Sequence, residues 1–150
     1  MLESQIEQDL KTALLGGDHI KVETLRGLKS ALLYAKVEKG KRDIGLTNDE
    51  ELQVLTKESK KRADSIEAYS RAGSEERADQ ELAEKAIIDQ YLPKQLSEDE
   101  LRVVVLGQIR DLGATSPSEM GKVIAAVKTQ VGVRADGGTI ANMVKKELSQ

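Results

Sequence analysis

Apolar residues recur every three or four positions along almost the whole chain, and this spacing is typical of amphipathic α-helices. The first stripe ends at the glycine pair Gly16 and Gly17, and Asp18 stands where it can cap a second helix that Gly40 ends. Residues 40–46 are charged and contain glycine, which predicts a loop. The two stripes are Leu2, Ile6, Leu10 and Leu14, then Val22, Leu25, Leu28 and Leu32.

The next two helices are marked by their ends. Thr47 followed three residues later by Glu50 is the capping-box pattern, and the helix it begins ends at Gly73. Ser74 can start a fourth helix, which Pro93 stops because the residue before a proline is pushed out of the helical region. The apolar positions are Leu52, Leu55, Ala63, Ile66 and Tyr69, then Leu82, Ala83, Ala86, Ile87 and Tyr91.

Three shorter helices are predicted after Pro93. Ser97 and Glu100 repeat the capping-box pattern, and Ser116 followed by Pro117 and Glu119 is a third such start with proline at the first helical position. Their apolar stripes are Leu101, Val104, Val105, Ile109 and Leu112, then Met120, Ile124, Val127 and Val131, and finally Ile140, Met143, Val144 and Leu148.

These patterns predict an all-α protein of about seven helices with no sheet. The natural boundary is the segment 93–97, which carries a proline and a new helix start. Residues 1–94 are then expected to form an N-terminal bundle of four longer helices, and residues 95–150 a small three-helix domain near the lower size limit of independent stability.

The amino-acid composition limits which residue types can form the core and which cellular compartment is expected. The chain has no Cys, Trp or Phe and 33% charged residues, so the core must be aliphatic, with charged outer helix faces. We expect Tyr34, Tyr69 and Tyr91, which follow helical stripes, at the edge of the core rather than as base-stacking platforms. Without cysteine there is neither a disulfide nor a thiolate metal site, which favours a cytoplasmic protein. No apolar run approaches 18 residues, so no membrane association is predicted.

Net charge gives no positive support for nucleic-acid binding. The formal charge is −3, with 16 basic against 19 acidic residues in 1–94 and 7 against 7 in 95–150. An RNA contact would therefore require a local basic patch.

The residues that carry chemistry are few. His19 is the only histidine, stands at a predicted helix start and has no partner nucleophile in any recognisable motif. Glu81 and Glu84 lie one helical turn apart, yet no histidine joins them, so a solvated or ion-paired face is favoured over a metal site. Phosphate-loop, dinucleotide and zinc motifs are absent. We therefore predict no catalytic residue, no metal and no cofactor.

Two groups of residues remain candidates for binding. Lys57, Lys60 and Lys61 share one face of the third predicted helix with Arg62 beside them, which indicates either a docking face or an ordinary solvated face.

The second group combines glycines with helix starts. Gly121 and Lys122 follow one start, and Asp136 with Gly137 and Gly138 marks another. Glycine allows close approach, and helix N-termini favour anions, so a phosphate-bearing partner is one interpretation. The other is that Gly121 lets two helices pack closely and that Asp136 is only an N-cap.

The amino-acid sequences of several segments, which together extend over nearly the whole chain, resemble those of the GatB/YqeY family. The tail resembles that of the GatB subunit of the glutamine-dependent tRNA amidotransferase. The matching segments are Thr24-Leu25-Arg26, Lys60-Lys61-Arg62-Ala63-Asp64-Ser65, Tyr91-Leu92-Pro93-Lys94-Gln95-Leu96-Ser97, Met120-Gly121-Lys122-Val123 and Arg134-Ala135-Asp136-Gly137.

The resemblance implies a YqeY-type N-terminal helical domain and a GatB-tail-like C-terminal domain. In the amidotransferase the tail helps to hold tRNA while other domains do the chemistry, and this chain contains none of those domains. By resemblance the RNA-binding residues are Gly121, Lys122, Arg134, Asp136 and Gly137. We further expect Lys122 and Arg134 to lie on one side of the tail, near the backbone amides of Gly137 and Gly138.

The expected function is a non-catalytic accessory protein of a bacterial cytoplasm that associates with tRNA or another structured RNA. The alternative is a protein-interaction module without RNA contact. The family also implies carbon–nitrogen ligase activity with glutamine as amido donor, for which the residues supply neither a nucleophile nor an ammonia channel.

Overall fold

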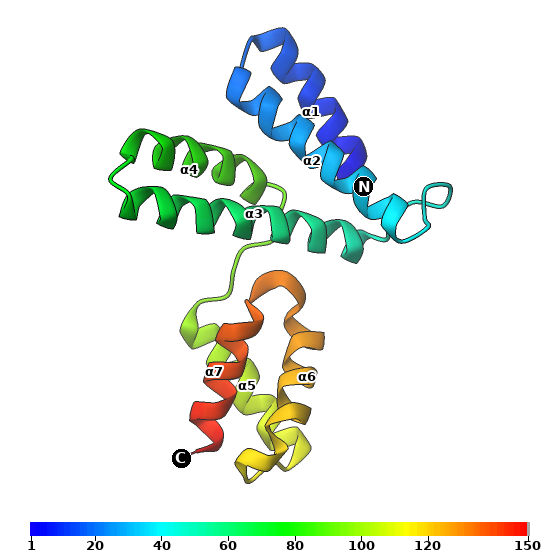
Figure 1. Cartoon of the computed structure of the whole chain (residues 1–150). Helices are drawn as coiled ribbons and strands as arrows, with labels where there is room; N and C mark the ends of the chain where they lie inside the picture. The colour runs from blue at the N-terminus through cyan, green and yellow to red at the C-terminus, as the bar shows by residue number, and fades with distance from the viewer. Residues whose placement is uncertain (150) are drawn as a thin grey trace. The chain divides into compact units, whose positions relative to one another are not determined.

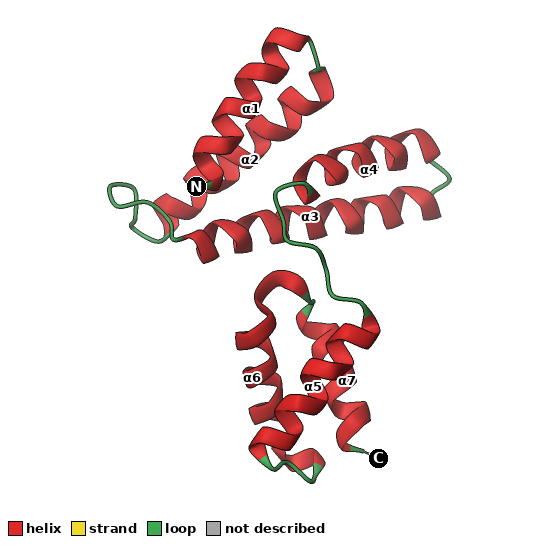
Figure 2. Ribbon diagram, turned by 180° about the vertical axis from the view of Figure 1, so that it is seen from behind, coloured by secondary structure: helices red, strands yellow, loops and turns green. Residues whose placement is uncertain are grey.

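The computed structural model describes residues 1–149, and these residues form seven α-helices and no strand (Figure 1 and Figure 2). The all-α prediction is confirmed. The chain divides into two compact units, Met1–Leu92 and a second unit that begins at Pro93.

The first unit begins with a helical hairpin of α1 (Leu2–Gly16) and α2 (His19–Glu38). Gly17 ends α1 in the left-handed conformation with φ 70°, which a residue with a side chain adopts only at a cost. The Asp18 carboxylate accepts a hydrogen bond from the Lys21 amide at 3.1 Å and so caps α2. Both ends lie where the sequence predicts them.

A second hairpin follows, made of α3 (Asn48–Arg71) and α4 (Glu75–Asp89). Both hydrogen bonds of the Thr47–Glu50 capping box are present at the start of α3, at 3.1 Å each. Helix α2 contacts α3 and α4, so the two hairpins pack on each other. Figure 1 shows the α1–α2 hairpin resting against the α3–α4 hairpin.

The core of the first unit is aliphatic, as predicted. Its buried members come from all four helices and the loop before α3: Ile6, Leu10, Ala13, Val22, Leu25, Leu28, Leu32, Ala35, Leu46, Leu55 and Ile88. Half-buried Tyr91 closes its edge and donates a hydrogen bond to the Asp9 carboxylate on α1. Burial, followed by this bond, raises the pKa of Tyr91 above its ordinary value.

Five positions expected in the core or at its edge are exposed instead, among them Ala86 and, in the second unit, Leu112. Leu14 and Leu82 are 50% and 54% exposed, and Tyr34 is 71% exposed. Leu14 lies in the last turn of α1, where buried Ala13 takes the inner position. Tyr34 follows buried Leu32 by two residues, which turns its side chain about 200° round the helix. The expectation that Tyr34 lies at the core edge is therefore wrong.

The second unit contains α5 (Glu98–Leu112), α6 (Met120–Val131) and α7 (Gly137–Leu148), with short 3₁₀ turns at Pro117–Glu119 and Gly132–Arg134. Each of its three α-helices contacts the other two. Its buried core contains no aromatic residue: Leu101, Val105, Ala114, Val123, Val127, Val131, Ile140, Met143, Val144 and Leu148. The capping box of Ser97 and Glu100 is present, with bonds of 3.4 and 3.1 Å.

Gly121 does not serve helix packing. Its backbone position is open, since a Cβ added there would meet no atom within 4 Å. Val123 and Val127 are fully buried, whereas Ile124 is only partly buried. Helix α6 therefore presents Val123 and Val127 to the core and turns Gly121 outward, which overturns the packing interpretation of this glycine.

In the part of the chain that the structure describes, every helix is too short or too polar to cross a lipid bilayer.

Candidate functional site

Arg62, one of the four residues of the predicted docking face, is held between α3 and α4. Its Nε lies 3.1 Å from Glu84 Oε2 and 3.6 Å from Glu81 Oε2, and a terminal nitrogen lies 3.9 Å from Glu58. The side chain is only 24% exposed. Arg62 thus links the two helices of the hairpin, and of the two surroundings expected for Glu81 and Glu84, solvated or ion-paired, the structure has the ion-paired one.

The same cluster perturbs Glu84. Burial, and then the nearby charge of Glu81, raise the pKa of Glu84 above its ordinary value, while Arg62 opposes the rise. Three carboxylates therefore surround one guanidinium, and within the described part of the chain only Glu58 has a second cation nearby, Lys61. Among the described residues no group of histidine, aspartate or glutamate side chains is arranged to hold a metal ion.

The other residues of the predicted face differ in their surroundings. Lys61 Nζ lies 3.3 Å from Glu58, and its side chain is 57% exposed. Lys57 has no carboxylate within 4 Å of its amine among the described residues, and Lys60 is exposed. Lys57 and Lys61, one turn apart, both line a groove between α2 and α3, whereas Lys60 does not.

This groove, which we call the α2/α3 groove, has a volume of about 620 Å³. Each wall is one stripe of a helix at the spacing i, i+3, i+4, i+7. Helix α2 supplies Gly27, Ser30, Ala31 and Tyr34, and then Ala35 and Glu38; helix α3 supplies Glu50, Gln53, Val54 and Lys57, and then Glu58 and Lys61; Lys39 completes the lining.

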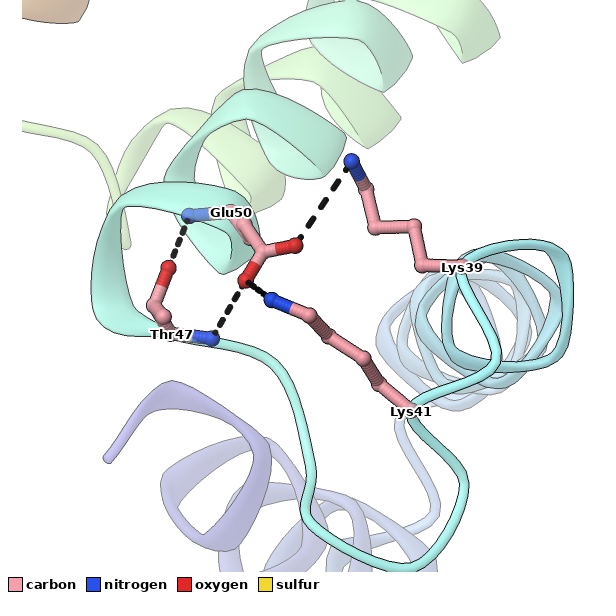
Figure 3. A network of polar contacts seen from close by, with 4 residues as sticks. All are labelled: Lys39, Lys41, Thr47 and Glu50. Atoms are coloured by element: carbon pink, nitrogen blue, oxygen red, sulfur yellow. Dashed lines mark hydrogen bonds and ion pairs between the residues drawn. The ribbon is translucent and has the colours of Figure 1, made fainter.

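At one end of the groove, Glu50 at the start of α3 links the two walls by contacts with residues at and after the end of α2 (Figure 3). Its Oε1 accepts hydrogen bonds from Lys41 Nζ at 2.5 Å and from the Thr47 amide at 3.1 Å, and its Oε2 lies 3.5 Å from Lys39 Nζ. Lys41 first, and then the Thr47 amide, lower the pKa of Glu50 to about 2. The end of α2 and the loop after it are thereby held against the start of α3.

The predicted phosphate-binding residues of the second unit are not gathered in one place. Lys122 lies in the first turn of α6, and Arg134 lies in the 3₁₀ turn after the end of that helix. Lys122 precedes the end of α6 at Val131 by nine positions of continuous helix, which corresponds to about 13 Å along the axis. The expectation that Lys122 lies with Arg134 near the amides of Gly137 and Gly138 is therefore wrong.

Arg134 is also engaged locally. Its guanidinium donates to the carbonyls of Val131 and Gln130 at 3.1 and 3.2 Å, at the end of α6. Its own carbonyl accepts from the Leu96 amide at 2.8 Å. Arg134 thus fixes the turn between α6 and α7 while keeping a positive charge beside it.

Asp136 caps α7. Its carboxylate accepts hydrogen bonds from the amides of Gly138 at 3.0 Å and Thr139 at 3.3 Å. Gly137 lies beside Lys128, whose Nζ is 3.5 Å from the point where a Cβ on Gly137 would lie. An anion at this helix start would have to displace the Asp136 carboxylate and would then meet the Lys128 amine.

Lys128 is not among the residues that the sequence predicts for this site. A signal for it existed, because a lysine in the last turn of a helix stands near the turn that follows. The lysine that matches the family motif is Lys122, which lies at the opposite end of α6.

A pocket of about 400 Å³ lies beside this turn, between α5 and α7; we call it the α5/α7 pocket. Its apolar lining is Leu96, Leu101, Ala135 and Met143, and its polar lining is Gln95, Ser97, Glu98, Arg102, Asp136, Thr139, Asn142 and Lys146. An apolar floor with amide, hydroxyl and cationic groups around it suits a flat, partly polar group.

The two cations of the α5/α7 pocket are not equivalent. Arg102 lies 3.4 Å from both Glu98 and Glu147, so its charge is shared. Lys146 is exposed and has no carboxylate within 4 Å of its amine among the described residues. Lys146 is thus the cation that a bound anion would meet first.

Comparison with known proteins identifies the family. No curated protein matches the chain. The family model described as Yqey-like protein matches residues 3–148, which is nearly the entire chain. The chain therefore belongs to the YqeY-like protein family.

Proposed function

We propose that this protein is a non-catalytic accessory protein that associates with tRNA or another structured RNA through its second unit. The observation that carries the proposal is the α5/α7 pocket, which adjoins the turn with the family-motif residues Arg134, Asp136 and Gly137. Sequence-specific recognition of RNA mostly uses bases of loops and single strands that are splayed out of the stack, and a pocket of this size suits one such base.

The lining supplies what such a base requires. Leu101 and Met143 offer an apolar surface, while Asn142 and Thr139 can exchange hydrogen bonds with the edge of a base. Lys146 stands at the pocket, and Lys128 and Arg134 lie near the start of α7, where flanking phosphates could be neutralised. The resemblance of this unit to a tail that helps to hold tRNA points in the same direction.

The non-catalytic part of the proposal rests on the side chains. His19 is exposed at the start of α2, and no hydroxyl or carboxylate among the described residues is hydrogen-bonded to it. We therefore do not propose carbon–nitrogen ligase activity for this chain.

The test is a binding assay with bulk tRNA, in which fluorescence anisotropy measures the affinity at about 50 and 200 mM salt. We expect affinity to fall with salt at a logarithmic slope of about −2, which corresponds to two or three phosphate contacts. Lys128→Glu with Lys146→Glu should weaken binding at least about tenfold, because two exposed cations, one at the pocket and one beside the start of α7, are reversed.

The matched control is Arg110→Glu, compared with the single reversal Lys146→Glu, because each makes the same change in charge on one exposed residue of the same unit. It should reduce affinity far less. Equal loss in both variants would mean that net charge, and not the pocket, determines binding. Absence of tRNA binding at low salt would overturn the proposal and would favour the protein-interaction alternative.

A further inference from the structure

We propose that the α2/α3 groove is the docking site for an acidic amphipathic helix of a protein partner. The proposal concerns the first unit and other residues than the RNA proposal, so either can fail without the other.

The shape of the groove fits a helix. Each wall is a helical stripe at the spacing i, i+3, i+4, i+7, which is the pattern that a helix presents to a neighbouring helix. On α2 the lining runs from Gly27 to Glu38, about 17 Å along the axis, so a partner of about three turns would fill it. A third helix laid between two others is a recurring mode of peptide recognition.

The floor permits close approach. Gly27, Ser30 and Ala31 are small and lie on one stripe of α2. Gly27 stands in the interior of α2, and a Cβ added there would meet nothing within 4 Å. A glycine in a helix interior is unfavourable, and no internal neighbour of the unit requires it here. Because Gly27 has no side chain, the groove stays open beside it.

Apolar anchors lie along the same stretch of α2. Tyr34 lines the groove and is 71% exposed, and Leu33 and Val37 beside it are 50% and 57% exposed. Val54 on α3 is partly buried and forms part of the opposite wall. An amphipathic helix in the groove would cover Tyr34 and Val54 with its apolar face, whereas Leu33 and Val37 lie outside the lining.

The charged residues of the α3 wall favour negative charge beside the apolar face of the partner helix. Glu50 is paired with Lys39 and Lys41, and Glu58 is paired with Lys61 and lies at the edge of the cluster in which Arg62 binds Glu81 and Glu84. Lys57 keeps an unpaired amine among the described residues, and Lys61 beside it shares Glu58 with Arg62. The lining as a whole is neutral, but Lys57 and Lys61 form a positive spot one turn long on the α3 wall, while the carboxylate of Glu38 stands on the α2 wall. Carboxylates at i and i+4 on a partner helix match that spacing.

The experiment uses the full chain and two designed peptides of about 18 residues, bridged by lactams because short helices are marginal alone. Both carry the same leucine face, one flanked by glutamates at i and i+4 and the other by lysines. We expect anisotropy to detect binding of the acidic peptide and preference for it over the basic one by about tenfold. Lys57→Glu with Lys61→Glu should invert that preference.

Gly27→Leu separates loss of the groove from loss of the fold. The new side chain fills the groove without an internal clash, so we expect binding to disappear while the thermal midpoint of the chain does not fall. Lys11→Glu with Lys21→Glu, the same charge change away from the groove, should leave the peptide preference unaltered.

Three outcomes would overturn the proposal. One is that both peptides bind with equal affinity, or that neither peptide binds. Another is unchanged binding by the Gly27→Leu variant. The third is a dimer in light scattering that Gly27→Leu dissociates, since the occupant would then be a second copy of the chain.

Discussion

Replacement of Arg62 by glutamine tests whether this arginine is a structural link or a docking residue. In the structure its guanidinium is the cation shared by Glu58, Glu81 and Glu84, which are 16%, 22% and 17% exposed. Glutamine preserves much of the length and removes the charge. Among the described residues, Glu81 and Glu84 would then face each other without a counter-ion, and Glu58 would keep only Lys61.

The expected cost follows from burial. Removing one partner of a fully buried ion pair destabilises a protein by about 3–5 kcal/mol, whereas an exposed pair contributes about 0–1 kcal/mol. The exposure of Arg62 lies between these limits, and its three carboxylates are closer to the fully buried limit than to the exposed one. We expect Arg62→Gln to lower the free energy of unfolding by about 2–3 kcal/mol at neutral pH.

The cost should depend on pH, because the pKa of Glu84 is raised in the folded protein. An acid with a raised folded pKa binds more protons folded than unfolded between its two pKa values, so stability falls as pH rises through that window. The window begins near the ordinary value of 4.5. Loss of Arg62 raises this pKa further, so the deficit of the variant should shrink as pH falls toward that value.

Urea denaturation followed by circular dichroism at about pH 7.5 and pH 5 measures both effects. The control is Arg71→Gln on the same helix, which removes the exposed i, i+4 pair with Glu67 and should cost less than about 0.5 kcal/mol. If Arg62→Gln costs no more than Arg71→Gln, or if its deficit is the same at both pH values, Arg62 does not neutralise this cluster. The docking interpretation of its motif would then regain support.

Three further predictions concern local features. Gly121→Ala should leave stability unchanged or raise it by up to about 1 kcal/mol in thermal melts, because the position is open and helical, whereas a packing glycine would lose stability. Thr47→Ala should lower the free energy of unfolding in urea by about 1 kcal/mol, because it removes the side-chain cap of α3. Lys41→Met should raise the pKa of Glu50 from about 2 toward 4.5 in an NMR titration, because Lys41 makes the largest contribution to the depression. In the wild type the stabilising effect of Glu50 is present above pH 4.5 and is lost as pH falls toward 2.

Helix positions could be predicted from the sequence because their signals are local. Thr47 and Ser97 open helices by hydrogen bonds to residues three positions away, and Gly17 and Gly113 close helices through their own backbone conformation. Which face of a helix is buried depends instead on distant partners. Tyr34 is therefore exposed despite an apolar pattern around it, because α2 turns Leu32 and Ala35 to the core.

The candidate sites were less predictable for the same reason. Arg62 belongs to a basic run on α3, but two of the carboxylates that bind it come from α4 and could not be assigned from α3 alone. The separation of Lys122 from the turn after α6 was predictable, since the continuous helix that follows Lys122 keeps it far from the residues after Val131. The α5/α7 pocket depends on how α5 and α7 pack, and no local pattern indicates it.

The aromatic residues give the protein an uneven optical signature. All three tyrosines, Tyr34, Tyr69 and Tyr91, lie in the first unit, and the chain has no tryptophan or phenylalanine. Near-ultraviolet absorbance and emission therefore report only on the first unit, while far-ultraviolet circular dichroism records the helices of both. The difference between the two signals in one melt isolates the second unit without any label. Conversely, one tryptophan introduced on α5 or α7 would be a probe without aromatic background in the unit proposed to bind RNA.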